Sequence, residues 1–181
     1  TGLNPAVVFG QIELGVLQIK HEILALDMPF KPFVRDVLLP FIAQHYAGCK
    51  LVAYCDPANP RDNNMGETPT QVLRQAGIEA VAAPTNKFKP RLDSVISFLQ
   101  RRDGLLIDKR CEKIIGGFRG GYHYRPLNIS GVGKAYSSEP VKNEYSHIAD
   151  AVQYLCNGIR HGSGNQQRST PVRRTATKRV Y

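Results

Sequence analysis

The chain has 181 residues, a hydrophobic fraction of 42%, a charged fraction of 22% and a formal net charge of +9. These values are typical of one soluble globular domain with a tail, and no apolar run approaches the roughly 20 residues that span a membrane. The N-terminus does not show the order of basic, apolar and small residues that marks a signal peptide. It also lacks a starting Met, and we expect the chain to be a piece of a longer protein.

About half of the basic excess belongs to the C-terminal end. Residues 161–181 contain five basic side chains and no acid, which leaves 19 basic against 15 acidic residues elsewhere. We therefore predict a folded domain at residues 1–160 and a flexible basic tail at 161–181. The body is only mildly basic, which permits nucleic-acid binding without demonstrating it.

The four cysteines do not have the spacing of a metal site. Cys49, Cys55, Cys111 and Cys156 form no CxxC pair, and two of them lie within apolar runs. This pattern is typical of buried, reduced thiols in a cytosolic protein. We expect no zinc site.

The first half of the sequence alternates strand and helix signals. Two β-rich runs, at residues 6–12 and 16–24, predict an antiparallel pair. A helix is predicted from Lys31-Pro32 to just before Gly48, because proline suits a first helical turn. The apolar run at 50–55 then predicts a strand covered on both faces, as in the interior of a parallel sheet.

The middle of the chain continues the alternation. Thr68 precedes proline and is followed by Gln71, which predicts a capped helix that ends near Gly77. Gly120-Gly121 predicts the turn of a β-hairpin. Further predicted elements are a strand at 78–82, a helix at 92–99, a strand at 105–107 and a small helix at 111–115.

The last predicted helix spans residues 146–160 and has an apolar stripe at helical spacing. Its other side is predicted to be polar and includes Asp150. Strands followed by alternating helices and strands, a hairpin and a closing helix indicate an α/β fold with a mixed sheet.

Two carboxylates are candidates for chemistry. Asp56 ends the apolar run at 50–55, and ligands of open α/β sheets gather beyond the carboxyl ends of strands. An Asp-Pro turn at Asp56-Pro57 explains the same residue equally well. Asp150 lies in the first turn of the last helix, where the helix dipole favours a carboxylate. His147 shares its face and can bind a metal, move a proton or simply donate a hydrogen bond.

Together these residues form a recognisable series. The sequence resembles the nuclease domain of the large terminase subunit of tailed bacteriophages, over roughly residues 1–160. The similar segments, in order, are residues 1–8, residues 54–59, residues 73–78, Arg91 before Val95 and Leu99, and residues 146–151 with the sequence Ser-His-Ile-Ala-Asp-Ala.

The resemblance implies a ribonuclease-H-like mixed central sheet flanked by helices, with an added β-hairpin. It implies three acids, of which Asp56 and Asp150 match the second and third as metal ligands and catalytic residues, with His147 beside them. The first acid precedes a segment like residues 1–5, so we expect it upstream of Thr1. Two Mg²⁺ or Mn²⁺ ions suit such carboxylates, because these hard cations prefer oxygen ligands. Asp62, Glu67 and Glu144 are candidates for outer acids, although loop composition explains them equally well.

The expected ligand is double-stranded DNA, contacted through phosphates without sequence specificity. A solvated surface charge remains the simpler explanation for each basic candidate: Arg61, Lys87, Lys89, Arg91, Arg119 and Arg125. Tyr122 and Tyr124 can stack on unpaired bases or merely pack within the hairpin.

As protein partners the resemblance implies an N-terminal ATPase domain of the same polypeptide, the small terminase subunit and the portal, in the host cytoplasm and transiently at the procapsid. The alternatives are another ribonuclease-H-like nuclease of the resolvase type, and a module that docks DNA or the portal without cutting.

Overall fold

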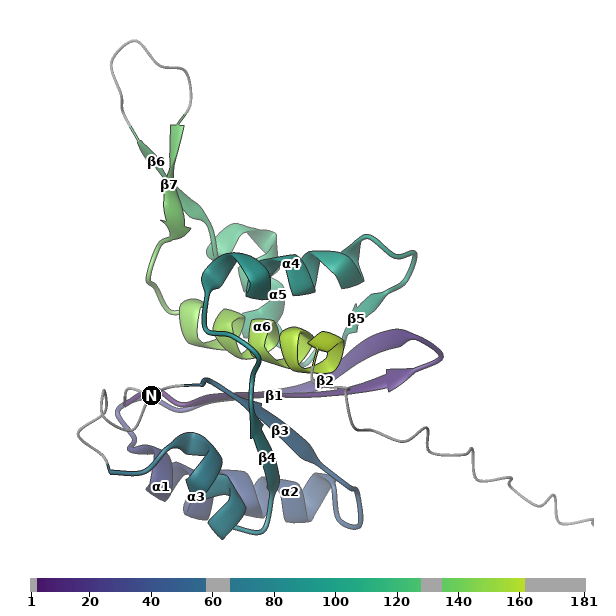
Figure 1. The fold of residues 1–181 in the computed structure, drawn as a ribbon, viewed down its shortest axis with the longest axis vertical. Helices are drawn as coiled ribbons and strands as arrows, with labels where there is room; N and C mark the ends of the chain where they lie inside the picture. The colour runs from purple at the N-terminus through teal and green to yellow at the C-terminus, as the bar shows by residue number, and fades with distance from the viewer. Residues whose placement is uncertain (1–2, 58–65, 128–134, 162–181) are drawn as a thin grey trace, which may run out of the picture.

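The computed structural model describes residues 3–57, 66–127 and 135–161 (Figure 1). Arg61 lies outside these ranges, and so does the predicted tail beyond His161. In chain order the elements are β1 (Ala6–Glu13), β2 (Val16–Leu24), α1 (Phe30–Phe33), the π-helical η1 (Val34–Leu38), α2 (Leu39–His45), β3 (Val52–Cys55), α3 (Pro69–Gln75), β4 (Glu79–Ala82), α4 (Phe88–Leu99), β5 (Leu105–Ile107), α5 (Glu112–Gly116), the π-helical η3 (Gly117–Gly121), β6 (Tyr124–Leu127), β7 (Ala135–Pro140) and α6 (Ser146–His161).

The strands form three separate groups in the described part of the chain. β2 pairs antiparallel with β1 and parallel with β5, which makes a three-stranded mixed sheet. β3 and β4 are a parallel pair, and β6 and β7 are an antiparallel pair. The prediction of an α/β fold with a mixed sheet is confirmed.

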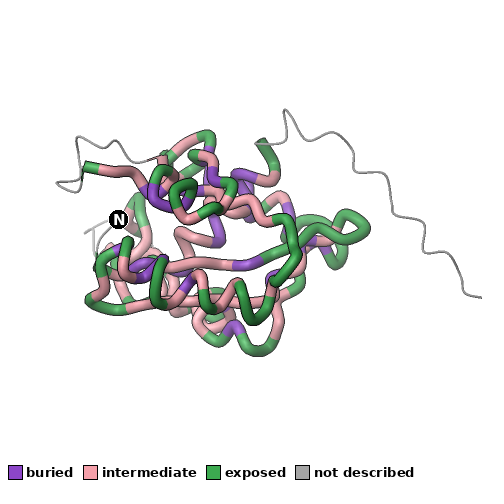
Figure 2. The backbone as a smooth tube through the Cα atoms, turned by 90° about the horizontal axis from the view of Figure 1, so that it is seen from below, coloured by how far each residue is buried: buried purple, intermediate pink, exposed green. Residues whose placement is uncertain are grey.

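β1 lies between two hydrophobic cores because successive strand residues point to opposite faces. Val7 and Phe9 pack into a core with α1, η1, α2, α3, β3 and β4. Ala6 and Val8 pack against the other core, with α4, α5 and α6. Figure 1 shows the two helical groups on opposite sides of β1 and β2. The buried segments lie inside this arrangement, whereas many connecting turns are exposed (Figure 2).

Strong local signals gave correct predictions. The Thr68 side chain accepts a hydrogen bond from the backbone N–H of Gln71. The Gln71 side chain accepts one from the backbone N–H of Thr68, so the predicted cap is confirmed. The first strand pair is confirmed, as is the last helix. Cys55, Cys111 and Cys156 are free and buried, but Cys49 is exposed, which the sequence pattern did not predict.

Three predictions were wrong. The segment around Gly120-Gly121 is the end of η3 and not a hairpin turn; the hairpin is made by β6 and β7. Gly120 has a φ of 109°, and this left-handed conformation ends the helix without starting a strand pair. The strand predicted at 50–55 is β3 and is parallel as predicted, but its interior position is wrong, because it has one strand neighbour in the described ranges and Val52–Tyr54 are partly exposed. The predicted polar side of α6 is in fact largely packed, because Ser146, Gln153 and Asn157 are buried.

No helix within the described residues is long and apolar enough to cross a membrane.

Candidate functional site

A cleft of about 470 Å³ lies between the three-stranded sheet and the pair of β3 and β4. One wall is the run from Asn4 to Gly10, which includes most of β1, and the opposite wall is the run from Lys50 to Asp56, which includes β3. The N-terminal half of α6 contributes a third side through His147, Asp150 and Tyr154. In the described structure neither β1 nor β3 pairs with a strand along its edge toward the cleft, since each has a single strand partner.

Asp56 stands at the end of β3, directly before Pro57. Its side chain is half-buried and lines the cleft. Cys55 precedes it inside the core and hydrogen-bonds through its backbone carbonyl to the N–H of Ala83, which follows β4. The strand therefore ends in a fixed position and presents the carboxylate to solvent in the cleft.

Asp150 lies one turn into α6 and lines the same cleft. Ile148 and Val152 hold that turn of the helix, since both are buried in the core shared with α4 and α5. The Asp150 side chain is 27% exposed. The structure thus brings Asp56 and Asp150 to one cleft, although they lie in elements far apart in the sequence.

Arg91 is the main contact of Asp150. Its Nη1 donates to Oδ1 of Asp150 over 2.9 Å, and Arg91 as a whole is only 8% exposed. The sequence assigned Arg91 to DNA contact, but its burial removes the side chain from the outer surface. The local sequence could not indicate Asp150 as the partner of Arg91, because α4 and α6 meet only in the folded chain.

Tyr154 is a second residue that the sequence analysis missed. Its ring faces the Arg91 guanidinium at 4.6 Å from Cζ to the ring centroid. The pKa of its hydroxyl is raised, chiefly by burial and further by the neighbouring Asp56 carboxylate. Its place one turn after Asp150 on α6 was the only sequence signal that could have indicated it.

The other predicted residues are more dispersed. His147 is exposed at the mouth of the cleft. Glu67 pairs with Lys31 and Glu144 pairs with Lys113, so neither joins the two central carboxylates. The basic candidates that remain exposed are Lys87, Lys89, Arg119 and Arg125. Arg61 and Asp62 lie outside the described residues.

The donor chemistry of the cleft fits a hard divalent cation in part. Two carboxylates face one space, and the ion pair with Arg91 engages only Oδ1 of Asp150, which leaves Oδ2 for a ligand. Across residues 3–57, 66–127 and 135–161, no group of three or more His, Cys, Asp and Glu side chains is arranged to hold a metal ion. Asp56 and Asp150 would therefore supply part of a ligand set.

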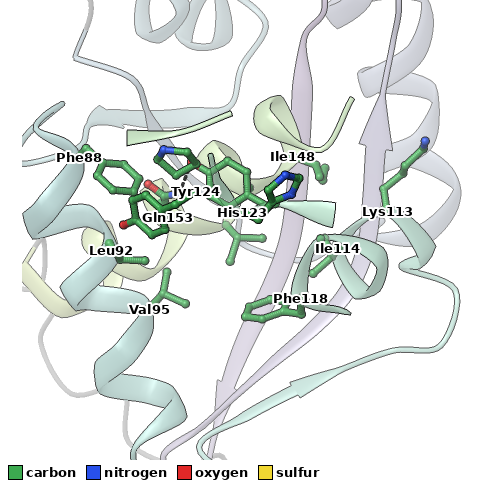
Figure 3. A pocket seen from close by; sticks show the side chains of 15 residues that line it. Phe88, Leu92, Val95, Lys113, Ile114, Phe118, His123, Tyr124, Ile148 and Gln153 are labelled. Atoms are coloured by element: carbon green, nitrogen blue, oxygen red, sulfur yellow. Dashed lines mark hydrogen bonds between the residues drawn. The ribbon is translucent and has the colours of Figure 1, made fainter. Parts of the chain in front are cut away.

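A second cavity, of about 230 Å³, lies between α4, α5, α6 and β6 (Figure 3). Its walls are mainly apolar and aromatic, with Phe88, Val95, Phe118 and Tyr124 among them. It contains none of the predicted acids. Tyr122 lines this cavity, is half-buried and accepts a hydrogen bond from Gln153.

Comparison with known proteins gives one structural likeness. No family model matches the chain, and no curated protein sequence matches it. The fold is similar to the crystal structure of the large terminase nuclease from the thermophilic phage G20c with bound cobalt, with a TM-score of 0.49 and 9% identity over 84% of this chain and 81% of that chain.

Proposed function

We propose that this chain is the endonuclease domain of a viral DNA-packaging terminase, with a ribonuclease-H-like arrangement of its strands. It would cut concatemeric double-stranded DNA when packaging begins and ends. The observation that carries the proposal is that Asp56 and Asp150 line one cleft. These are the two acids that the sequence motifs single out, and they come from a strand end and a distant helix.

The chemistry is hydrolysis of a phosphodiester bond. Asp56 and Asp150 would hold Mg²⁺ or Mn²⁺, and a pair of such ions supplies an activated water and stabilises the leaving oxygen. A third acid from upstream of Thr1 would complete the ligand set. The exposed imidazole of His147 can move a proton at the mouth of the cleft.

DNA would approach along exposed basic side chains. Lys87 and Lys89 lie at the start of α4, and Arg119 and Arg125 lie in and after η3. Contacts of this kind to phosphates are independent of sequence, as a motor that packages a whole genome requires. The proposed protein partners are the ATPase domain of the same polypeptide, the small terminase subunit and the portal, in the host cytoplasm.

A second candidate is a module that docks DNA or the portal without cutting it. This alternative is favoured by one observation: the described residues contain two grouped acids and no third. A resolvase-type nuclease is a further alternative that shares the same acids.

A plasmid-nicking assay with Mn²⁺ or Mg²⁺ separates these functions. A nuclease of the proposed kind converts supercoiled plasmid to nicked and linear forms with little sequence preference. A docking module shifts the mobility of the DNA and leaves it intact, while a resolvase prefers branched junctions to linear duplex.

A further inference from the structure

The burial of Arg91 requires an explanation. A guanidinium removed from water is costly unless an opposite charge compensates it. Asp150 provides that charge through the 2.9 Å contact, while Nε of Arg91 is buried and has no hydrogen-bond partner in the described structure. One ion pair with Asp150 thus holds Arg91 in the interior, away from the surface where a phosphate contact would need it.

The same guanidinium also contacts a second residue of the cleft. The Tyr154 ring lies under Arg91, and Tyr154 lines the same cleft as Asp56. The contacts run from Tyr154 through Arg91 to Asp150. They link α4 with α6, two elements far apart in the sequence.

We propose that Arg91 and the Tyr154 ring beneath it act as positioning residues that hold the carboxylate of Asp150 in the orientation in which the cleft binds a divalent cation. This inference rests on the proposed function for the role of the two acids. It adds two residues that do not touch the substrate and assigns Arg91 to the interior of the site.

The geometry explains why arginine and tyrosine suit these positions. A planar guanidinium can stack on a ring and donate a directed N–H bond at the same time, whereas a lysine ammonium does not stack in this way. The contact with one carboxylate oxygen fixes the rotamer of Asp150 and leaves the other oxygen for a ligand. Partners of this kind, behind the ligands of a metal, commonly change its affinity by about 10- to 100-fold.

The test measures Mn²⁺ binding to the protein without DNA. Arg91→Ala should weaken Mn²⁺ binding by at least about tenfold. Added guanidinium ion should recover part of this loss, because it can occupy the vacated space over the Tyr154 ring. Arg101→Ala is the matched control, because Arg101 also lies over a ring, that of Phe98, but is exposed and does not line the cleft. It should bind Mn²⁺ as the parent does.

Tyr154→Phe tests the part that the ring plays. It keeps the ring beneath Arg91 and removes only the hydroxyl, so Mn²⁺ binding should weaken less than in Arg91→Ala. If Arg91→Ala does not fold, Arg91→Gln decides. Parent-like Mn²⁺ binding in a folded Arg91→Ala or Arg91→Gln protein overturns the proposal. Tighter binding also overturns it, because Arg91 would then compete with the cation.

The outcome is distinguishable from failure of the proposed function. If the parent nicks plasmid and binds Mn²⁺ while folded Arg91 variants bind it equally well, the function stands and the positioning role is lost. If no form of the domain cuts DNA or binds Mn²⁺, the function fails, and melting temperatures alone test the contact. The double variant Arg91→Ala/Asp150→Asn should then melt no lower than the less stable of the two single variants. If the two single losses of melting temperature instead add in the double variant, the coupling is refuted.

Discussion

Gly158 lets α6 approach β3 closely, and this approach sets the distance between the two candidate acids. A Cβ atom at Gly158 would lie 2.1 Å from Cγ and 2.2 Å from Cδ1 of Tyr54. These atoms belong to the base of a ring and cannot move aside like the end of a flexible side chain. Because Tyr54 precedes Asp56 on β3 and Asp150 lies on α6, Gly158→Ala must shift the helix or the strand.

The size of the effect follows from two opposing contributions. Alanine at an open helix position is more stable than glycine by about 1 kcal/mol. Overpacking of a filled interior costs about 1–3 kcal/mol, and the overlap here is at the severe end. We therefore expect Gly158→Ala to lower the free energy of unfolding by about 1–2 kcal/mol. With a slope of about 2 kcal/mol/M, in the middle of the usual range, the urea midpoint should fall by roughly 0.5–1 M.

Gly117→Ala is the matched control. Gly117 has helical dihedral angles, and a Cβ atom there would meet nothing nearer than 3.8 Å. This variant should be as stable as the parent or slightly more stable. In a Tyr54→Ala background, Gly158→Ala should lose its cost, since the obstructing ring is gone. A Gly158→Ala protein that is as stable as the parent would refute the close packing of α6 on β3.

Three further predictions follow from other contacts. The edges of β1 and β3 that border the cleft have no strand partner in the described structure. A protein that begins roughly ten residues upstream of Thr1 has enough chain for one more strand and its turn, so it should melt higher and nick plasmid faster than one that begins at Thr1. Equal melting temperatures and equal nicking rates would exclude an added strand. Burial raises the pKa of the Cys111 thiol to about 11 and that of the Cys156 thiol to about 12. At pH 8 a thiol reagent should therefore modify the exposed Cys49 rapidly, and Cys111 and Cys156 only when the protein unfolds. Fast labelling of all three thiols in the native protein would contradict the packing of the second core. Glu22 accepts the backbone N–H groups of Lys113 and Ile114 with its two carboxylate oxygens, so Glu22→Leu should cost about 1–3 kcal/mol in a urea titration, while Glu13→Leu on the exposed part of β1 should cost little.

Local signals explain which parts of the fold the sequence could predict. The Thr68 cap, the two long antiparallel strands and the stripe of α6 depend on residues within a few positions of one another. The hairpin turn predicted at Gly120-Gly121 was wrong because two adjacent glycines favour such a turn in sequence, yet here they end a helix. The antiparallel pair of β6 and β7 starts at Tyr124, four residues after Gly120.

The candidate site shows the same division. The positions of Asp56 after a strand and of Asp150 near the start of a helix could be predicted, because a strand end and a first helical turn are recognisable in sequence. The role of Arg91 could not, since its burial and its ion pair arise only when α4 packs on α6. Tyr154 was hidden for a similar reason, because an aromatic residue on an amphipathic helix usually fills a core.

The most direct test of the central claim is metal-dependent nicking by the parent domain and by Asp56→Asn and Asp150→Asn, each checked for folding by its melting temperature. Each substitution keeps the side-chain shape and removes the charge that a divalent cation requires. We predict that the parent, in a form that includes the residues upstream of Thr1, nicks plasmid with Mn²⁺, and that both folded variants do not. If both variants cut at the parent rate, the acids of this cleft do not carry a nuclease activity.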